Sequence, residues 1–242
     1  MHFSRFINMF IVIGIISSTI IAGTLKGNVS YEGKIPKKKS LKMDADPVCG
    51  SSHKTPVYNQ SFIINEDGYL KNVLVYLKEV NYNGKPPEEP AILDQKGCIY
   101  EPHVQALMIG QELLIKNSDA TLHNIHGLPK INSEFNFAMP RVVKEKGITI
   151  AKPEQHIYVK CDVHPWMKSY ISAFNHPYFA ITDETGSYKI EDIPPGKYEI
   201  VAWQEKFKDK ATKEWKTLLA SVEIGEGESK QDFTFVRPNK KK

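Results

Sequence analysis

Short apolar runs separated by turn residues make up most of the chain from residue 24 onward. The runs are rich in Val, Ile, Leu and Tyr, and Gly, Pro, Asn or Asp bounds each of them, which is the pattern of β-strands. The predicted strands lie at 24–31, 70–77, 111–117, 156–161, 170–174, 188–190, 197–203 and 221–224. No helical period is sustained, and only 205–215 is expected to hold one or two helical turns. The pattern therefore predicts an all-β protein built from β-sandwiches.

The first two dozen residues follow a different pattern. Arg5 precedes a mostly apolar run over 6–21, which ends in Ala22-Gly23. This is the layout of a secretory signal, so we expect a signal peptide over 1–23 and export to the periplasm. The alternative is an uncleaved helix that anchors the chain, because the run approaches the length that a bilayer requires. Export would place the remainder where disulfides persist.

Composition and charge exclude several classes of protein. With 41% hydrophobic and 25% charged residues over 242 positions, the chain is neither disordered nor fibrous. A formal charge of +4 is too weak to indicate a nucleic-acid partner. The sequence contains no Gly-x-Ser-x-Gly, His-Glu-x-x-His or phosphate-binding loop. We therefore predict that the protein is not an enzyme and has no small-molecule substrate.

One seven-residue run carries three kinds of metal donor. Cys161, His164 and Met167 follow a predicted strand in the spacing Cys-x-x-His-x-x-Met, and His123 follows an Asn-Ser-Asp turn upstream. A thiolate, two imidazoles and a thioether are the donor set of a blue-copper site. His126 is the alternative first ligand. Zinc in a Cys-His₂ setting is an alternative metal, although the methionine favours copper.

The segments IGQELLIKNSDATLHNIH (109–126) and VKCDVHPWMKSYISAF (159–174) resemble the cupredoxin family, of the amicyanin and plastocyanin type. The resemblance implies a Greek-key β-sandwich over 97–178 that holds one type 1 copper ion. It assigns His123, Cys161 and His164 as ligands and Met167 as the axial thioether. It also implies that Asn124 ties the two ligand loops together by hydrogen bonds near the sulfur.

The segment ITDETGSYKIEDIPPGKYEIVAW (181–203) resembles the carboxypeptidase regulatory-like family, a transthyretin-type β-sandwich. That family opens with strands similar to 23–36 and 70–80, which here precede the copper segment. The resemblance implies one such sandwich in two parts, 24–96 and 179–236, with the copper segment inserted and a basic tail over 237–242. Similar proteins are labelled methylamine utilization proteins.

Two cysteines remain once Cys161 is assigned to copper. In an exported chain we expect Cys49 and Cys98 to form a disulfide, which would close a loop of about 50 residues. The alternative is a second copper site made of Cys49, His53, Cys98 and His103.

The favoured function is that of an exported electron carrier with a transient redox partner, such as a c-type cytochrome or a dehydrogenase. We expect the electron to leave through His164, inside an apolar rim that includes Pro165 and Trp166. Basic residues expected around that rim, facing an acidic partner, are Lys130, Arg141, Lys144, Lys146 and Lys168. The alternatives are a copper-binding or delivery protein without electron transfer, and a structural or adhesive envelope module.

Overall fold

The computed structural model describes residues 22–209 and 211–237. The predicted signal peptide lies outside the described residues except for Ala22 and Gly23, and the basic tail lies outside them except for Arg237. Within the described ranges, no helix is long and apolar enough to cross a membrane.

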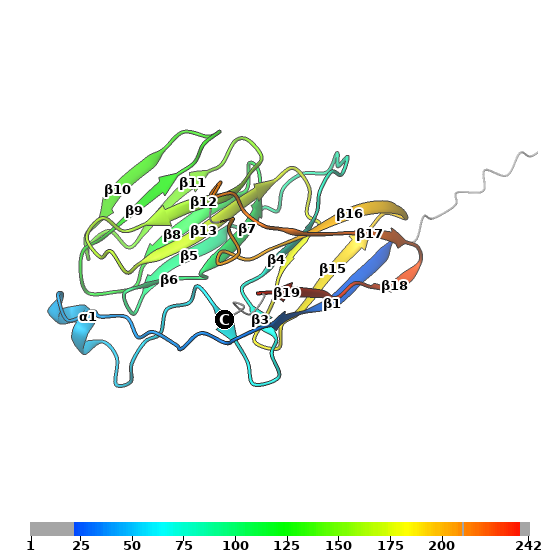
Figure 1. Cartoon of the computed structure of the whole chain (residues 1–242). Helices are drawn as coiled ribbons and strands as arrows, with labels where there is room; N and C mark the ends of the chain where they lie inside the picture. The colour runs from blue at the N-terminus through cyan, green and yellow to red at the C-terminus, as the bar shows by residue number, and fades with distance from the viewer. Residues whose placement is uncertain (1–21, 210, 238–242) are drawn as a thin grey trace, which may run out of the picture.

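The all-β prediction is confirmed, because strands connected by turns account for nearly all the regular structure described (Figure 1). The one helix in these ranges is α1 (Pro47–Ser51). The strands are β1 (Gly23–Glu32), β2 (Ile63–Ile64), β3 (Leu70–Lys71), β4 (Leu74–Leu77), β5 (Ala91–Lys96), β6 (Ile99–Glu101), β7 (Val104–Met108), β8 (Glu112–Asn117), β9 (His123–Leu128), β10 (Phe135–Met139), β11 (Glu145–Thr149), β12 (Glu154–Lys160), β13 (Lys168–Phe174), β14 (Phe179–Ile181), β15 (Ser187–Ile193), β16 (Gly196–Trp203), β17 (Leu218–Ile224), β18 (Gly227–Lys230) and β19 (Phe233–Val236).

Two sheets from the two ends of the chain form the first sandwich, which we call the outer sandwich. In one sheet β1 lies between β15 and β18 and also pairs with β19, and the other sheet has the order β14-β4-β16-β17. Buried residues of β1 and β16, such as Leu25 and Ile200, belong to one core cluster. The strict alternation of burial along β1 follows from this packing, since one face meets the core and the other meets solvent.

The second sandwich, which we call the inner sandwich, comes from the middle of the chain. Its sheets have the orders β10-β9-β12-β13-β7 and β11-β8-β5-β6. Leu93, Leu107 and Ile115 are completely buried in the core between these sheets. The chain leaves the outer sandwich after β4 and returns in β14, and these two strands are hydrogen-bonded neighbours.

A third, smaller core joins the two sandwiches. It contains Leu74 of β4, Tyr170 and Phe174 of β13, and Trp203 of β16. Strand β13 is therefore covered on both faces, because Ile171 points into the core of the inner sandwich and its neighbour Tyr170 into the junction. This explains why β13 is buried almost continuously rather than in alternation.

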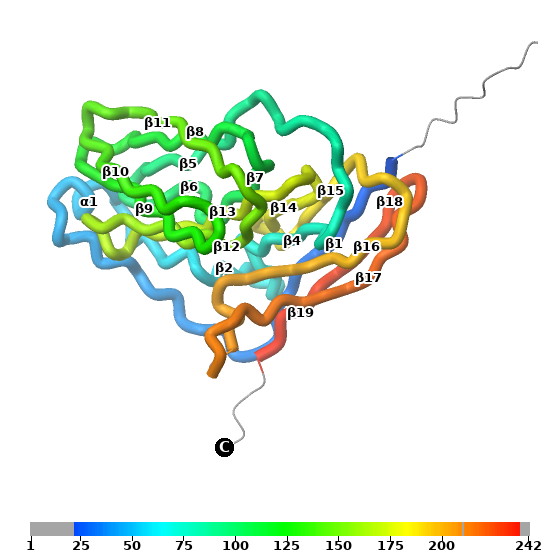
Figure 2. The backbone as a smooth tube through the Cα atoms, turned by 90° about the horizontal axis from the view of Figure 1, so that it is seen from above, coloured from blue at the N-terminus to red at the C-terminus, as the bar shows by residue number. Residues whose placement is uncertain are grey.

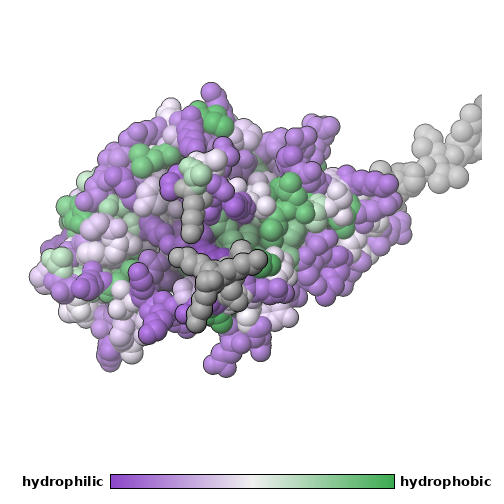
Figure 3. Space-filling model, viewed as in Figure 1, coloured by the Kyte–Doolittle hydropathy of each residue, from purple (hydrophilic) through white to green (hydrophobic). Residues whose placement is uncertain are grey.

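A long connection crosses from one sandwich to the other before β2 begins. Residues 33–62, which we call the strap, run from the end of β1 to α1 at the far end of the inner sandwich and then return to β2 (Figures 1 and 2). Met43 and Cys49 of the strap are buried in the core of the inner sandwich. The face shown in Figure 3 is mostly hydrophilic, with hydrophobic residues in small groups.

Two local expectations differ from the structure. The run at 70–77 is broken into β3 and β4, because Asn72 adopts a left-handed conformation with φ of 62°. The segment 205–215 contains no helix in its described part; Lys208 instead forms an isolated bridge with Trp215.

Candidate metal centre

The candidate ligands lie at one end of the inner sandwich. His123 is the first residue of β9, while Cys161, His164 and Met167 lie in the turn between β12 and β13. Two backbone hydrogen bonds fix this turn: the Met167 N–H donates to His164 O (2.9 Å), and the Cys161 N–H donates to Met167 O (3.2 Å). Neighbouring antiparallel strands β9 and β12 thus bring the two loops together.

Two imidazoles and the thiol face one another in a buried group. The Nδ1 atoms of His123 and His164 are 2.9 Å apart, and His164 Nδ1 is 3.8 Å from Cys161 Sγ. One ligand atom from each of the three residues lies within 4.8 Å of the others. His123, Cys161 and His164 are each at most 2% exposed. Met167 is 1% exposed and belongs to the same core cluster.

One of these two separations is already that of a trigonal metal site, and the other is shorter. Bonds of about 2.0 Å to nitrogen and about 2.3 Å to sulfur require donors about 3.5 and 3.7 Å apart. The nitrogen–sulfur separation matches, and the shorter nitrogen–nitrogen separation is that of a hydrogen bond. The donor set itself, with one soft thiolate and two imidazoles, is the trigonal set that copper takes in electron-transfer sites.

The surroundings of Cys161 favour the thiolate. Burial raises the pKa of the thiol, but a hydrogen bond with His123 lowers it. Backbone N–H groups of Asn124 (3.5 Å) and His164 (3.3 Å) also donate to the sulfur. Together these donors bring the pKa of Cys161 below its ordinary value, which prepares the sulfur to bind a metal.

Each candidate histidine ligand has a carboxylate on its other ring nitrogen. Asp119 Oδ2 lies 2.8 Å from His123 Nε2, and Asp46 Oδ2 lies 3.1 Å from His164 Nε2. Burial opposes the charged form of His123, yet the contacts with Asp119 and Cys161 raise its pKa to about 9. Each carboxylate binds Nε2 of one imidazole and leaves Nδ1 of that ring directed toward the sulfur. Hydrogen bonds to the non-ligating nitrogen commonly orient histidine ligands in this way.

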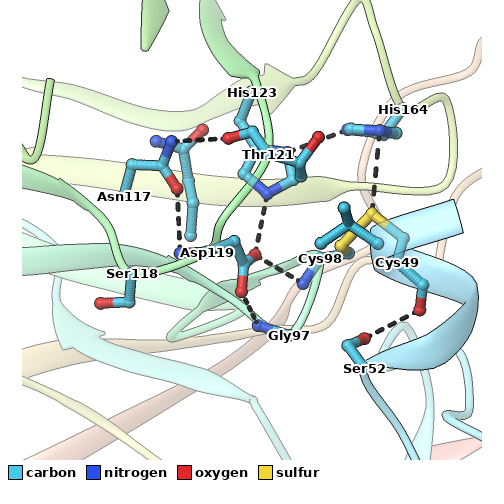
Figure 4. Close-up of polar contacts among 12 residues, drawn as sticks. Cys49, Ser52, Gly97, Cys98, Asn117, Ser118, Asp119, Thr121, His123 and His164 are labelled. Carbon is cyan, nitrogen blue, oxygen red and sulfur yellow. Dashed lines mark hydrogen bonds and ion pairs between the residues drawn. A yellow bond between two sulfur atoms is a disulfide. The ribbon is translucent and has the colours of Figure 1, made fainter. Parts of the chain in front are cut away.

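The strap covers His164. Asp46 is the N-cap residue of α1 and accepts from the N–H groups of Val48 (2.8 Å) and Cys49 (3.1 Å). Cys49 and Cys98 form a disulfide, and Cys49 Sγ lies 3.8 Å from His164 Nε2 (Figure 4). His164 is 2% exposed, so it does not lie at an open apolar rim as the sequence led us to expect.

Asn124 connects the two ligand loops. Its side-chain Oδ1 accepts a hydrogen bond from the Asp162 backbone N–H (2.5 Å), and its own backbone N–H donates to Cys161 Sγ. His126, the alternative first ligand, lies between Asp162 (2.8 Å) and Glu134 (2.6 Å). The structure therefore groups His123, and not His126, with the sulfur.

The alternative second copper site is not assembled. Cys49 and Cys98 are joined to each other, and His53 Nε2 lies 2.6 Å from Gly97 O. His103 is at the junction of the sandwiches, 3.4 Å from Glu205.

Sequence reasoning missed Asp46 and Asp119, although each has a local signal. Asp46 precedes Pro47, and an acidic cap followed by proline marks the start of a helix. Asp119 lies in the turn four residues before His123. No local signal shows that Asp46 meets His164, because 118 positions separate them.

Comparisons with known proteins give weak likenesses. No protein-family model matches the chain, and no curated protein matches it. An oxidised amicyanin mutant aligns with a TM-score of 0.31 and 16% identity, over 35% of this chain and 82% of amicyanin. A copper-containing nitrite reductase from Thermus scotoductus SA-01 aligns with a TM-score of 0.31 and 20% identity, over 40% of this chain and 25% of the reductase chain. A purple cupredoxin from Nitrosopumilus maritimus aligns with a TM-score of 0.30 and 16% identity, over 35% of this chain and 99% of the cupredoxin chain.

Proposed function

We propose that the protein is an exported electron carrier with one type 1 copper site at His123, Cys161, His164 and Met167. The observation that carries this proposal is the buried convergence of one nitrogen from each of two histidines and one sulfur within 4.8 Å. Copper, when bound, supplies a one-electron step between its two common oxidation states.

The residues of the chain prepare that step. Backbone N–H groups and His123 stabilise the Cys161 thiolate, and Asp119 and Asp46 orient the two imidazoles. Burial excludes water from the ligands, so little needs to rearrange around the site when its charge changes. A redox protein would be the partner.

Visible absorption and EPR spectra of the full chain with added Cu(II) and an oxidant test the proposal. We expect an intense thiolate-to-copper band and a narrow copper hyperfine splitting. Cys161→Ser should abolish the band, whereas His126→Gln, at the alternative ligand, should leave it unchanged. A wild-type protein that binds no copper and stays colourless would exclude the proposal.

The cover over His164 favours a second function, the holding and delivery of copper without electron transfer. His164 is 2% exposed beneath Asp46 and the disulfide, so direct contact with a partner is obstructed. Slow electron self-exchange together with tight, reversible Cu(I) binding would support delivery. Fast self-exchange in the intact protein would support the carrier.

A further inference from the structure

A cavity of about 550 Å³ lies where the two sandwiches meet, outside the candidate metal centre. Its walls come from the end of β9, from β12 and β13, and from the connection between β16 and β17, which reaches toward the inner sandwich (Figures 1 and 2). The volume lies in the range of small-molecule sites, which occur preferentially between domains.

Aromatic rings form much of the wall. Tyr158, Tyr170 and Trp215 line the cavity, and Trp203 lies behind them. The ring centroids of Tyr158 and Tyr170 are 5.5 Å apart, and those of Tyr170 and Trp215 are 5.8 Å apart. The planes of these two pairs are inclined by 49° and 84°, so the wall offers both ring faces and ring edges to an aromatic ligand.

The charged groups of the wall give it a positive balance. Lys168 is paired with Glu205 at 2.9 Å, but Lys130 and Lys208 have no carboxylate partner within the described ranges. Glu154 also lines the cavity, and its carboxylate accepts hydrogen bonds from the N–H groups of the turn at 130–132, which hold it in the ionised form. Lys130 and Lys208 therefore outnumber the one unpaired carboxylate among the described residues of the wall, and the Lys208 ammonium group lies 3.5 Å from the centroid of the Trp215 ring.

The backbone of the wall is irregular at the same place. The register of β12 against β13 shifts between Glu154 and Ile157, and His156 within this bulge has a φ of 63°. The His156 ring stacks on Trp203 with centroids 4.3 Å apart. Bulges and left-handed residues other than glycine are enriched beside functional sites, where they redirect a side chain.

From these observations we propose that the junction cavity binds a planar organic anion, such as an arene carboxylate or sulfonate. The ring of the ligand packs against a tyrosine face and meets the other aromatic rings edge to face, and its anionic group meets Lys130 and Lys208. This site is separate from the candidate copper ligands and does not depend on the proposed function.

Calorimetric titration of the full copper-free chain with naphthalene-2-sulfonate tests the proposal. We expect saturable one-to-one binding that the double variant Lys130→Glu/Lys208→Glu weakens at least about tenfold. The matched control is Lys85→Glu/Lys96→Glu, which makes the same charge change at exposed positions outside the cavity wall and should leave affinity unchanged.

Two further probes separate the parts of the proposal. Uncharged 2-naphthalenemethanol and inorganic sulfate should each bind at least about tenfold more weakly than the arene sulfonate. Equal binding of either probe, equal effects of the two double variants, or no saturable binding of the arene sulfonate would overturn the proposal. If the glutamate variant fails to fold, Lys208→Met gives the same comparison with one neutralised charge.

Discussion

At the residue scale, the centre combines ligands that are close in sequence with partners that are not. Cys161, His164 and Met167 are set by one turn, so their spacing alone predicted them as a group. The Asp46 contact with His164 depends on the path of the strap, which no local pattern specifies. Local donor motifs are therefore predictable from sequence, whereas the contact between Asp46 and His164 is found only in the fold.

Replacing Asp46 by asparagine tests its role as a positioning residue. Asn is also a good helix cap, so α1 should persist while the negative charge beside His164 is lost. We expect Cu(II) affinity to fall about 10- to 100-fold and the potential to become more positive, because the carboxylate stabilises the more highly charged ion. Chelator competition measures the Cu(II) affinity, and spectroelectrochemistry measures the reduction potential. The control is Asp44→Asn, which removes the same charge at an exposed position two residues earlier. Equal affinities and equal potentials in the two variants would contradict the role of Asp46 as a positioning residue.

His156 should make stability fall in mild acid. Burial, aided by Lys208 and Lys130, lowers its pKa from 6.5 to about 3. The unfolded state therefore binds more protons than the folded state between these two pH values. The contribution of neutral His156 to the free energy of unfolding is fully present above pH 6.5 and is lost as the pH falls toward 3. At pH 5 the loss is about 2 kcal/mol.

Urea unfolding at pH 7 and pH 5 measures this effect. His156→Asn is the comparison, because asparagine tolerates a left-handed backbone and does not titrate. The wild type should lose about 2 kcal/mol more than this variant between the two pH values. An equal loss in both proteins would show that other groups cause the acid sensitivity.

At the element scale, the strap and β13 illustrate what strand patterns miss. Strand β13 was predicted by its apolar run, yet only the structure shows that its two faces meet different cores. The strap has no regular pattern beyond α1, and its position depends on buried Met43 and on the disulfide. Irregular segments of this kind take their path from tertiary contacts, which sequence periodicity does not encode.

Removing the disulfide by Cys49→Ser/Cys98→Ser should destabilise the protein by roughly 4 kcal/mol. The estimate follows from the loop entropy of a 49-residue separation. The same variant should exchange copper with a chelator faster, because α1 is no longer fastened over His164. Guanidinium unfolding and stopped-flow chelation measure the two effects. Unchanged chelation kinetics with lowered stability would mean that the strap does not limit access.

At the scale of the whole molecule, the junction core should make the two sandwiches unfold together. Leu74 is fully buried there, so Leu74→Ala should cost about 2–5 kcal/mol. The exposed Leu219 gives the control Leu219→Ala, which should change stability by less than about 0.5 kcal/mol. Calorimetry should show one transition in the wild type. Two resolved transitions in the wild type would contradict the coupling.

The pairing of β1 has a consequence for how the chain is made. Its partners β15, β18 and β19 all come from the last part of the sequence, after every strand of the inner sandwich. A chain that emerges with its N-terminus first can complete the inner sandwich while β1 still has exposed, unpaired edges. Because β4 and β14 are neighbours, a folded inner sandwich brings the two halves of the outer one together and shortens the loop they must close. The strand made first is then among the last to be paired.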